Sequence, residues 1–100
     1  MTIMDTATNG KLLIIDDEVV AVENLAHAFR KAGYAVTSRT SGPGGINALE
    51  NDHYDVVLTD LRMERVDGLA VLQRAQELDP DTAVIMITAH ATLDSAVEAS

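Results

Sequence analysis

Four short runs of apolar residues alternate along the chain with longer segments in which apolar and polar residues are mixed. The runs cover residues 11–15 (KLLII), 34–38 (YAVTS), 54–59 (YDVVLT) and 83–88 (AVIMIT). Their length and their β-branched residues predict strands. The first run is apolar from Leu12 to Ile15, which predicts a strand buried on both faces, as in a parallel sheet.

The segments between the runs have apolar residues at helical spacing. The first predicted helix begins near Glu18 and ends before Gly33, a residue that readily adopts the left-handed backbone found after helix C-termini. Its predicted inward positions lie three or four residues apart and are Val22, Leu25, Ala26, Phe29 and Ala32.

Capping and turn residues predict three further helices. Pro43 suits the first turn of one helix, and Asp67 suits the N-cap of another, which Asp79-Pro80 would stop. A last helix is predicted from about Thr92. The predicted inward residues are Ile46 and Leu49 in the second helix, and Leu69, Leu72 and Ala75 in the third.

This alternation of strands and helices predicts an α/β fold, a doubly wound parallel sheet with right-handed crossovers and helices on both faces. One hundred residues suit one such domain. We expect residues 1–10 to be a flexible leader and residues 11–100 to form the domain.

Composition narrows the class of protein. Apolar residues make up 47% of the chain and charged residues 23%, a balance typical of a globular domain. The net charge of -9 argues against direct contact with nucleic acid. The absence of cysteine excludes thiolate metal sites, and the apolar runs are too short to span a membrane. The leader lacks the order of a signal peptide, so we predict a cytoplasmic protein with no membrane partner.

The candidate functional residues lie where the predicted strands end. Asp16 and Asp17 follow the first strand, Asp60 follows the third, and Thr88 closes the fourth. These ends converge on one crevice if the first strand lies between the second and the third. Three clustered carboxylates repel one another unless a cation compensates, and an oxygen-only donor set suits Mg²⁺. A carboxylate beside that ion can accept a phosphoryl group, and a hydroxyl such as that of Thr88 can hydrogen-bond it.

Each of these residues also has an ordinary structural interpretation. Asp16 and Asp17 suit a helix N-cap, Asp60 suits a turn, and Thr88 suits a strand end. Their joint occurrence at three strand ends, in this order, favours a functional site.

At this point the sequence resembles the receiver domain of bacterial two-component response regulators, which has a flavodoxin-like, CheY-like fold. The resemblance covers residues 11–100 and rests on the motifs LLIIDDE (12–18), DVVLTDLRM (55–63), DGL (67–69) and VIMITAHA (84–91). The segment TAHATLDSAVEA and the motif DLRM are most similar to receivers of nitrogen-regulation-type (NtrC-like) transcription activators. The resemblance implies a sensor histidine kinase as phosphodonor and an output domain or downstream protein, such as a transcription activator.

The resemblance also implies residue roles. Asp60 would be the phosphoacceptor. Mg²⁺ would be held by Asp60, by Asp17 directly and by Asp16 through water. The Arg62 backbone carbonyl would be a further ligand of Mg²⁺. Thr88 would supply the switch hydroxyl, and the backbone amide of Ala89 would contact the phosphoryl group.

The sequence departs from the family pattern in two places. Glu64-Arg65 stands where the family usually has Pro-Gly, and we interpret Glu64 as a solvated turn residue. The family's fifth strand, the lysine at its end and its fifth helix have no counterpart in this sequence, which predicts an incomplete receiver. An uncovered fourth strand predicts self-association through this strand and the last helix, or by exchange of elements between protomers.

Two other functions remain open on this reasoning. A receiver-like docking module that is never phosphorylated is compatible with the missing lysine. A magnesium-dependent phosphohydrolase of the haloacid-dehalogenase type would need a second acid two residues after Asp60, where Arg62 stands. We therefore predict no enzyme, apart from catalysis of its own phosphorylation and dephosphorylation.

Overall fold

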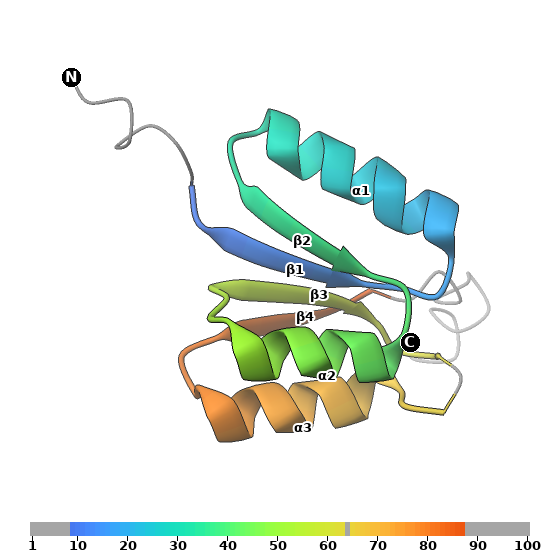
Figure 1. Ribbon diagram of the computed structural model, residues 1–100, viewed down its shortest axis with the longest axis vertical. Helices are drawn as coiled ribbons and strands as arrows, with labels where there is room; N and C mark the ends of the chain where they lie inside the picture. The colour runs from blue at the N-terminus through green and yellow to red at the C-terminus, as the bar shows by residue number, and fades with distance from the viewer. Residues whose placement is uncertain (1–8, 64, 88–100) are drawn as a thin grey trace, which may run out of the picture.

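The computed structural model describes residues 9–63 and 65–87, which form a four-stranded parallel sheet between two layers of helices (Figure 1). The strands lie in the order β2-β1-β3-β4, so the first strand does lie between the second and the third. α1 covers one face, and α2 and α3 cover the other. The elements are β1 (Lys11–Ile15), α1 (Val19–Lys31), β2 (Ala35–Arg39), α2 (Gly42–Asn51), β3 (Val56–Asp60), α3 (Gly68–Leu78) and β4 (Ala83–Ile87).

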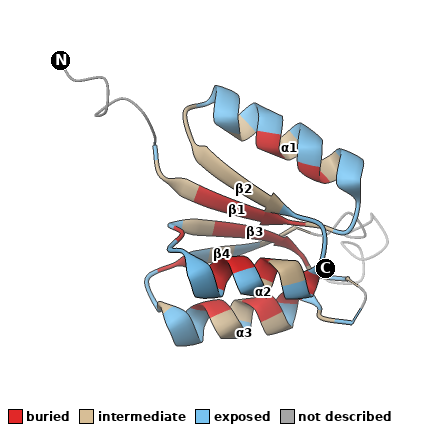
Figure 2. Cartoon of the chain, viewed as in Figure 1, coloured by how far each residue is buried: buried red, intermediate tan, exposed pale blue. Residues whose placement is uncertain are grey.

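β1 is the centre of the hydrophobic core, as its continuous apolar run predicted. Its side chains alternate between the two faces of the sheet. Leu12 and Ile14 pack with Val22 and Ala26 of α1. On the other face, Leu13 and Ile15 pack against α2 and α3. Figure 2 shows β1 buried along almost its whole length, while the outer sides of the helices are exposed. The doubly wound fold class is therefore confirmed.

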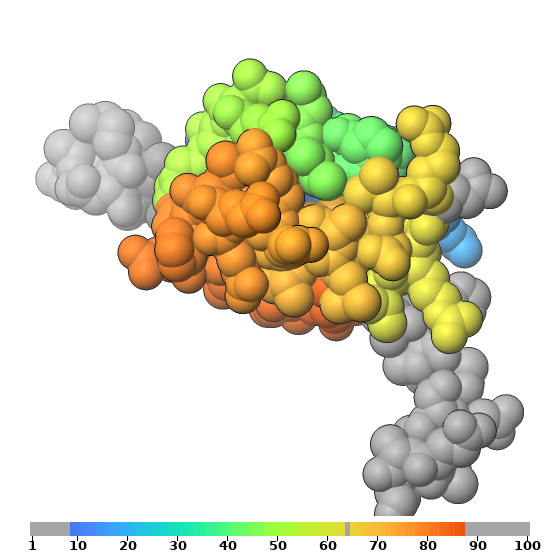
Figure 3. Space-filling model, turned by 90° about the horizontal axis from the view of Figure 1, so that it is seen from below, coloured from blue at the N-terminus to red at the C-terminus, as the bar shows by residue number. Residues whose placement is uncertain are grey.

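α3 begins at the N-cap that the sequence predicted, and Pro43 lies in the first turn of α2 as predicted, whereas the Ser41 cap of α2 was not predicted. Asp67 accepts a hydrogen bond from the Ala70 N–H at 3.0 Å, and Ser41 accepts one from the Gly44 N–H at 3.0 Å. Gly33 follows α1 with a φ of 101°, the left-handed conformation expected there. The N-termini of α2 and α3 lie at the same end of the sheet as the carboxyl ends of the strands (Figure 1). Figure 3 shows α2 and α3 side by side on the face that they cover.

Several predicted positions are shifted or wrong. β2 begins and ends one residue later than predicted, β3 begins at Val56 and includes Asp60, and Ala32 is an exposed C-cap. Leu69, predicted to face inward, is 58% exposed, whereas Val71 is fully buried. Leu69 lies about 200° around the helix from Val71. Residues 92–100, where the last helix is predicted, lie outside the described residues.

Candidate functional site

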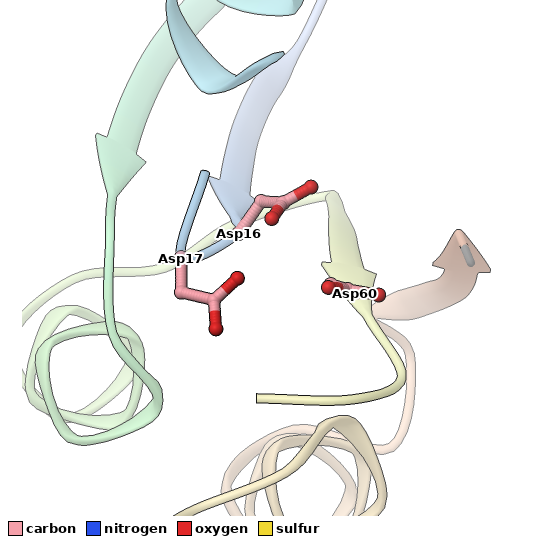
Figure 4. Close-up of side chains that lie close together, drawn as sticks. All are labelled: Asp16, Asp17 and Asp60. Carbon is pink, nitrogen blue, oxygen red and sulfur yellow. The ribbon is translucent and has the colours of Figure 1, made fainter. Parts of the chain in front are cut away.

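Pairing of β1 with β3 brings the predicted acids together. Ile15 is directly opposite Thr59 in the parallel register, so the residues that follow, Asp16 and Asp60, lie side by side at the carboxyl end of the sheet. Asp17 follows in the loop that leads to α1. One carboxylate oxygen from each of the three residues lies within 4.8 Å of the others, and the three side chains surround a common space (Figure 4).

The three carboxylates differ in their exposure and therefore in their electrostatics. Asp60 is only 6% exposed, Asp16 is half-buried and Asp17 is exposed. Burial raises the pKa of Asp16 above its ordinary value of 3.8, and the nearby charges of Asp60, Asp17 and Glu18 raise it further. The Glu18 N–H donates to Asp16 Oδ1 at 3.0 Å and opposes this shift. The site therefore disfavours the ionised form of Asp16.

The loop after β3 holds Asp60 in place through backbone contacts. The Arg62 N–H points toward Asp60 Oδ1 at 3.4 Å. The Leu61 N–H donates to the Ile87 carbonyl at 3.2 Å, and the Gly68 N–H donates to the Leu61 carbonyl at 3.0 Å. These bonds connect the end of β3 to β4 on one side and to the start of α3 on the other, which fixes where Asp60 points.

Gly68 and Gly42 let the loops approach closely, a role that the sequence analysis missed. A Cβ on Gly68 would overlap the Asp60 carbonyl oxygen and come within 2.9 Å of Leu61 Cα. A Cβ on Gly42 would overlap the Val66 carbonyl oxygen. The DGL motif contained the signal for Gly68, but only the tertiary structure shows which atoms require a glycine there.

Arg65 is the second feature that the sequence analysis did not identify as functional. Its φ is 68°, which makes it the one non-glycine residue with a positive φ in the described part of the chain. It stands where the resemblance implies a glycine, a residue that adopts this left-handed backbone far more readily than arginine does. Arg65 lines a cavity beside Asp17.

Of the other predicted site residues, the structure describes only Arg62. Its N–H lies 3.4 Å from Asp60 Oδ1, which places the Arg62 backbone beside the carboxylates. Thr88 and Ala89 lie outside the described residues. Glu64 is likewise outside the described residues.

The donor set fits a hard divalent cation. Three carboxylates supply oxygen ligands without histidine, as Mg²⁺ prefers. Opposite ligands of an octahedral Mg²⁺ are about 4.2 Å apart, twice the usual metal–oxygen distance. A separation of up to 4.8 Å between the carboxylate oxygens therefore suits an ion held by one or two of them directly, with water completing the shell.

Fold and site together define a doubly wound α/β domain with an acidic site at the carboxyl end of its sheet, and known proteins share the fold. The family model described as "Response regulator receiver domain" matches residues 12–100. The DNA-binding transcriptional regulator NtrC of Klebsiella pneumoniae is 40% identical over 90 residues, which cover 90% of this chain and 19% of NtrC. The transcriptional regulatory protein GlrR of Escherichia coli is 34% identical over 89 residues, which cover 89% of this chain and 20% of GlrR.

A solved structure with the same fold is the CheX-CheY-BeF3-Mg+2 complex from Borrelia burgdorferi. It has a TM-score of 0.78 and 28% identity, and the match covers 95% of this chain and 73% of that one. The chain therefore belongs to the response regulator receiver family, as its motifs predicted, and its relatives include NtrC-like regulators. It spans about one fifth of the length of GlrR and NtrC. Among the described residues, no helix is long and apolar enough to cross a membrane.

Proposed function

We propose that this chain is a phosphoacceptor receiver of a two-component system, in which Asp60 takes a phosphoryl group from a histidine kinase with the help of Mg²⁺. The observation that carries the proposal is the convergence of Asp16, Asp17 and Asp60 at the carboxyl end of β1 and β3. The CheX-CheY-BeF3-Mg+2 complex from Borrelia burgdorferi supports it, because a structure with the same fold contains Mg²⁺.

In this proposal each residue of the acidic site has its own role. Asp60 is the nucleophile, oriented by the Arg62 N–H and by the loop bonds of Leu61. Asp17 and Asp60 would hold Mg²⁺ directly and Asp16 would do so through water, with the Arg62 carbonyl as a further ligand. When bound, the ion supplies positive charge that offsets the carboxylates and the incoming phosphoryl oxygens. Thr88 and Ala89 would bind the transferred group, and this assignment stays a prediction.

The wider role follows from the relatives and remains part of the proposal. NtrC and GlrR are both named as transcriptional regulators. These relatives suggest that this receiver acts on an output domain or downstream protein that controls transcription. The receiver would act in the cytoplasm, without contacting nucleic acid or membrane itself. Residues 1–10 would be a flexible leader to the domain formed by residues 11–100. Its own phosphorylation and dephosphorylation would be the only reactions it catalyses.

Labelling of Asp60 tests the function. With Mg²⁺ and a small phosphodonor, we expect borohydride trapping and mass spectrometry to find one modified residue, Asp60. Asp60→Asn keeps the side-chain shape and should abolish the label, because the amide is not a nucleophile. Asp81→Asn, a matched change at an exposed acid remote from the site, should leave the label in place. Label elsewhere, or an unlabelled wild-type chain that still binds Mg²⁺, would favour the docking module instead.

We also propose that the chain self-associates through the edge strand β4. Within residues 9–63 and 65–87, β4 pairs only with β3, and its Ile85 is 50% exposed. Ile85 is opposite Leu58, on the α1 side of the sheet. We expect this 100-residue chain to sediment above monomer mass at micromolar concentration and Ile85→Lys to shift it toward monomer. Leu78→Lys, on the opposite face, is the control. Equal behaviour of the two variants would contradict association through β4.

A further inference from the structure

A cavity beside the acidic site extends it toward α2. The cavity has a volume of about 220 Å³ and is lined by Asp17, Thr40, Ser41, Pro43, Met63 and Arg65. Asp17 belongs both to this lining and to the carboxylate cluster, whereas Asp60 does not line the cavity. The cavity therefore lies on the Asp17 side of the site, away from the proposed nucleophile.

Arg65 is the source of positive charge in this cavity. It is the one cationic residue among those that line it. The start of α2 offers few backbone donors there, because Pro43 has no N–H and the Gly44 N–H is already bonded to Ser41 Oγ. Among the described residues, Arg65 takes part in no ion pair, unlike Lys11 and Arg74. Arg65 is therefore the one lining residue that can offer a positive charge to an anion in the cavity.

The geometry of phosphoryl transfer decides on which side of phosphorus the leaving group of the donor lies. The attacking and leaving oxygens lie roughly in line on opposite sides of phosphorus. An Asp60 oxygen forms the new bond to phosphorus. The bond from phosphorus to the donor breaks on the far side, and its electron pair leaves with the donor group. With acetyl phosphate this group is acetate, which departs as an anion, so no further reactant is needed.

We propose that Arg65 is a specificity-determining residue that binds the carboxylate leaving group of small acyl phosphates in this cavity. The inference rests on the proposed function, because it requires Asp60 to be the phosphoacceptor. A guanidinium pairs well with a carboxylate and gains most when negative charge builds up on the departing oxygen. Donors whose leaving group is not an anion should gain nothing from Arg65.

Two phosphodonors, tested on the full chain with Mg²⁺, distinguish an anionic leaving group from a neutral one. Acetyl phosphate releases acetate, whereas phosphoramidate releases ammonia. Arg65→Gly removes the cation and suits a φ of 68°, so the loop backbone is retained. We expect it to slow labelling of Asp60 by acetyl phosphate about 5–10-fold, the size of one exposed charge-assisted contact. Labelling by phosphoramidate should change less than about 2-fold, and Arg65→Lys should keep most of the acetyl phosphate rate.

The other outcomes are equally informative. An equal loss with both donors would mean that Arg65 only shapes the loop, and no loss with either would mean that it faces a different partner, such as an acidic surface of the kinase. Both results overturn the inference and leave the proposed function intact. A wild-type chain that neither donor labels would overturn the proposed function itself. The thermal shift caused by Mg²⁺ should be unchanged in Arg65→Gly, and a lost shift would assign the residue to metal binding instead.

Discussion

Gly68→Ala is expected to lower the free energy of unfolding by about 2–3 kcal/mol, in the range measured for overpacked sites. The new methyl group would overlap the Asp60 carbonyl oxygen and crowd Leu61 Cα, and neither backbone atom can rotate away as a side chain can. The better helix propensity of alanine offsets at most about 1 kcal/mol of this cost. Since domains of this size are stable by only about 5–15 kcal/mol, the melting temperature should fall by about 8 °C or more.

The change should also affect the site, because relief of the overlap requires α3 and the end of β3 to move apart. Labelling of Asp60 in Gly68→Ala should therefore be slower at temperatures where the variant is still folded. Leu69→Ala is the matched control: Leu69 is the next residue in α3 and is 58% exposed, so its loss should cost less than about 0.5 kcal/mol. Thermal melts that place both variants within 2 °C of the wild type would contradict this account of Gly68.

The parts of the fold that could be predicted from sequence are those fixed by local chemistry. The continuous apolar run from Leu12 to Ile15 predicted a strand buried on both faces, and burial on both faces is observed. Asp67 predicted a helix start, because its side chain can accept an N–H that the helix itself leaves unbonded. The proximity of Asp16 to Asp60 was predicted on the condition that the first strand lies between the second and the third, and the observed strand order meets this condition.

The parts that could not be predicted depend on contacts between distant segments. Leu69 has the same hydrophobicity as residues that do face inward, but the close approach of Gly68 to Asp60 sets the rotation of α3 and turns Val71 toward the sheet instead. The left-handed backbone of Arg65 has no signal in its own residue type, since arginine rarely adopts it. The cavity beside Asp17 combines three loops, and no single segment of sequence encodes it.

The charges of the acidic site determine how the stability of the fold changes with pH and with a divalent cation. Because the pKa of Asp16 is raised on folding, its ionised form is less favourable in the folded chain than in the unfolded one. Stability is therefore lost as pH rises from the ordinary value of 3.8 through the higher folded pKa, and the full cost is present at neutral pH. A divalent cation between the carboxylates opposes this cost, so it should stabilise the fold at pH 7 and have less effect near pH 3, where Asp16 is protonated.

Mg²⁺ is accordingly expected to raise the melting temperature of the wild-type chain at pH 7. At ten times its dissociation constant the ion contributes about 1.4 kcal/mol by mass action, or about 6 °C or more for a domain of this size. Asp17→Asn should remove nearly all of this shift, because it deletes the exposed charged ligand while keeping its shape. Asp81→Asn should retain the shift, and NaCl at the same ionic strength should not reproduce it. If the shift persisted in Asp17→Asn, the ion would be bound somewhere other than at Asp16, Asp17 and Asp60.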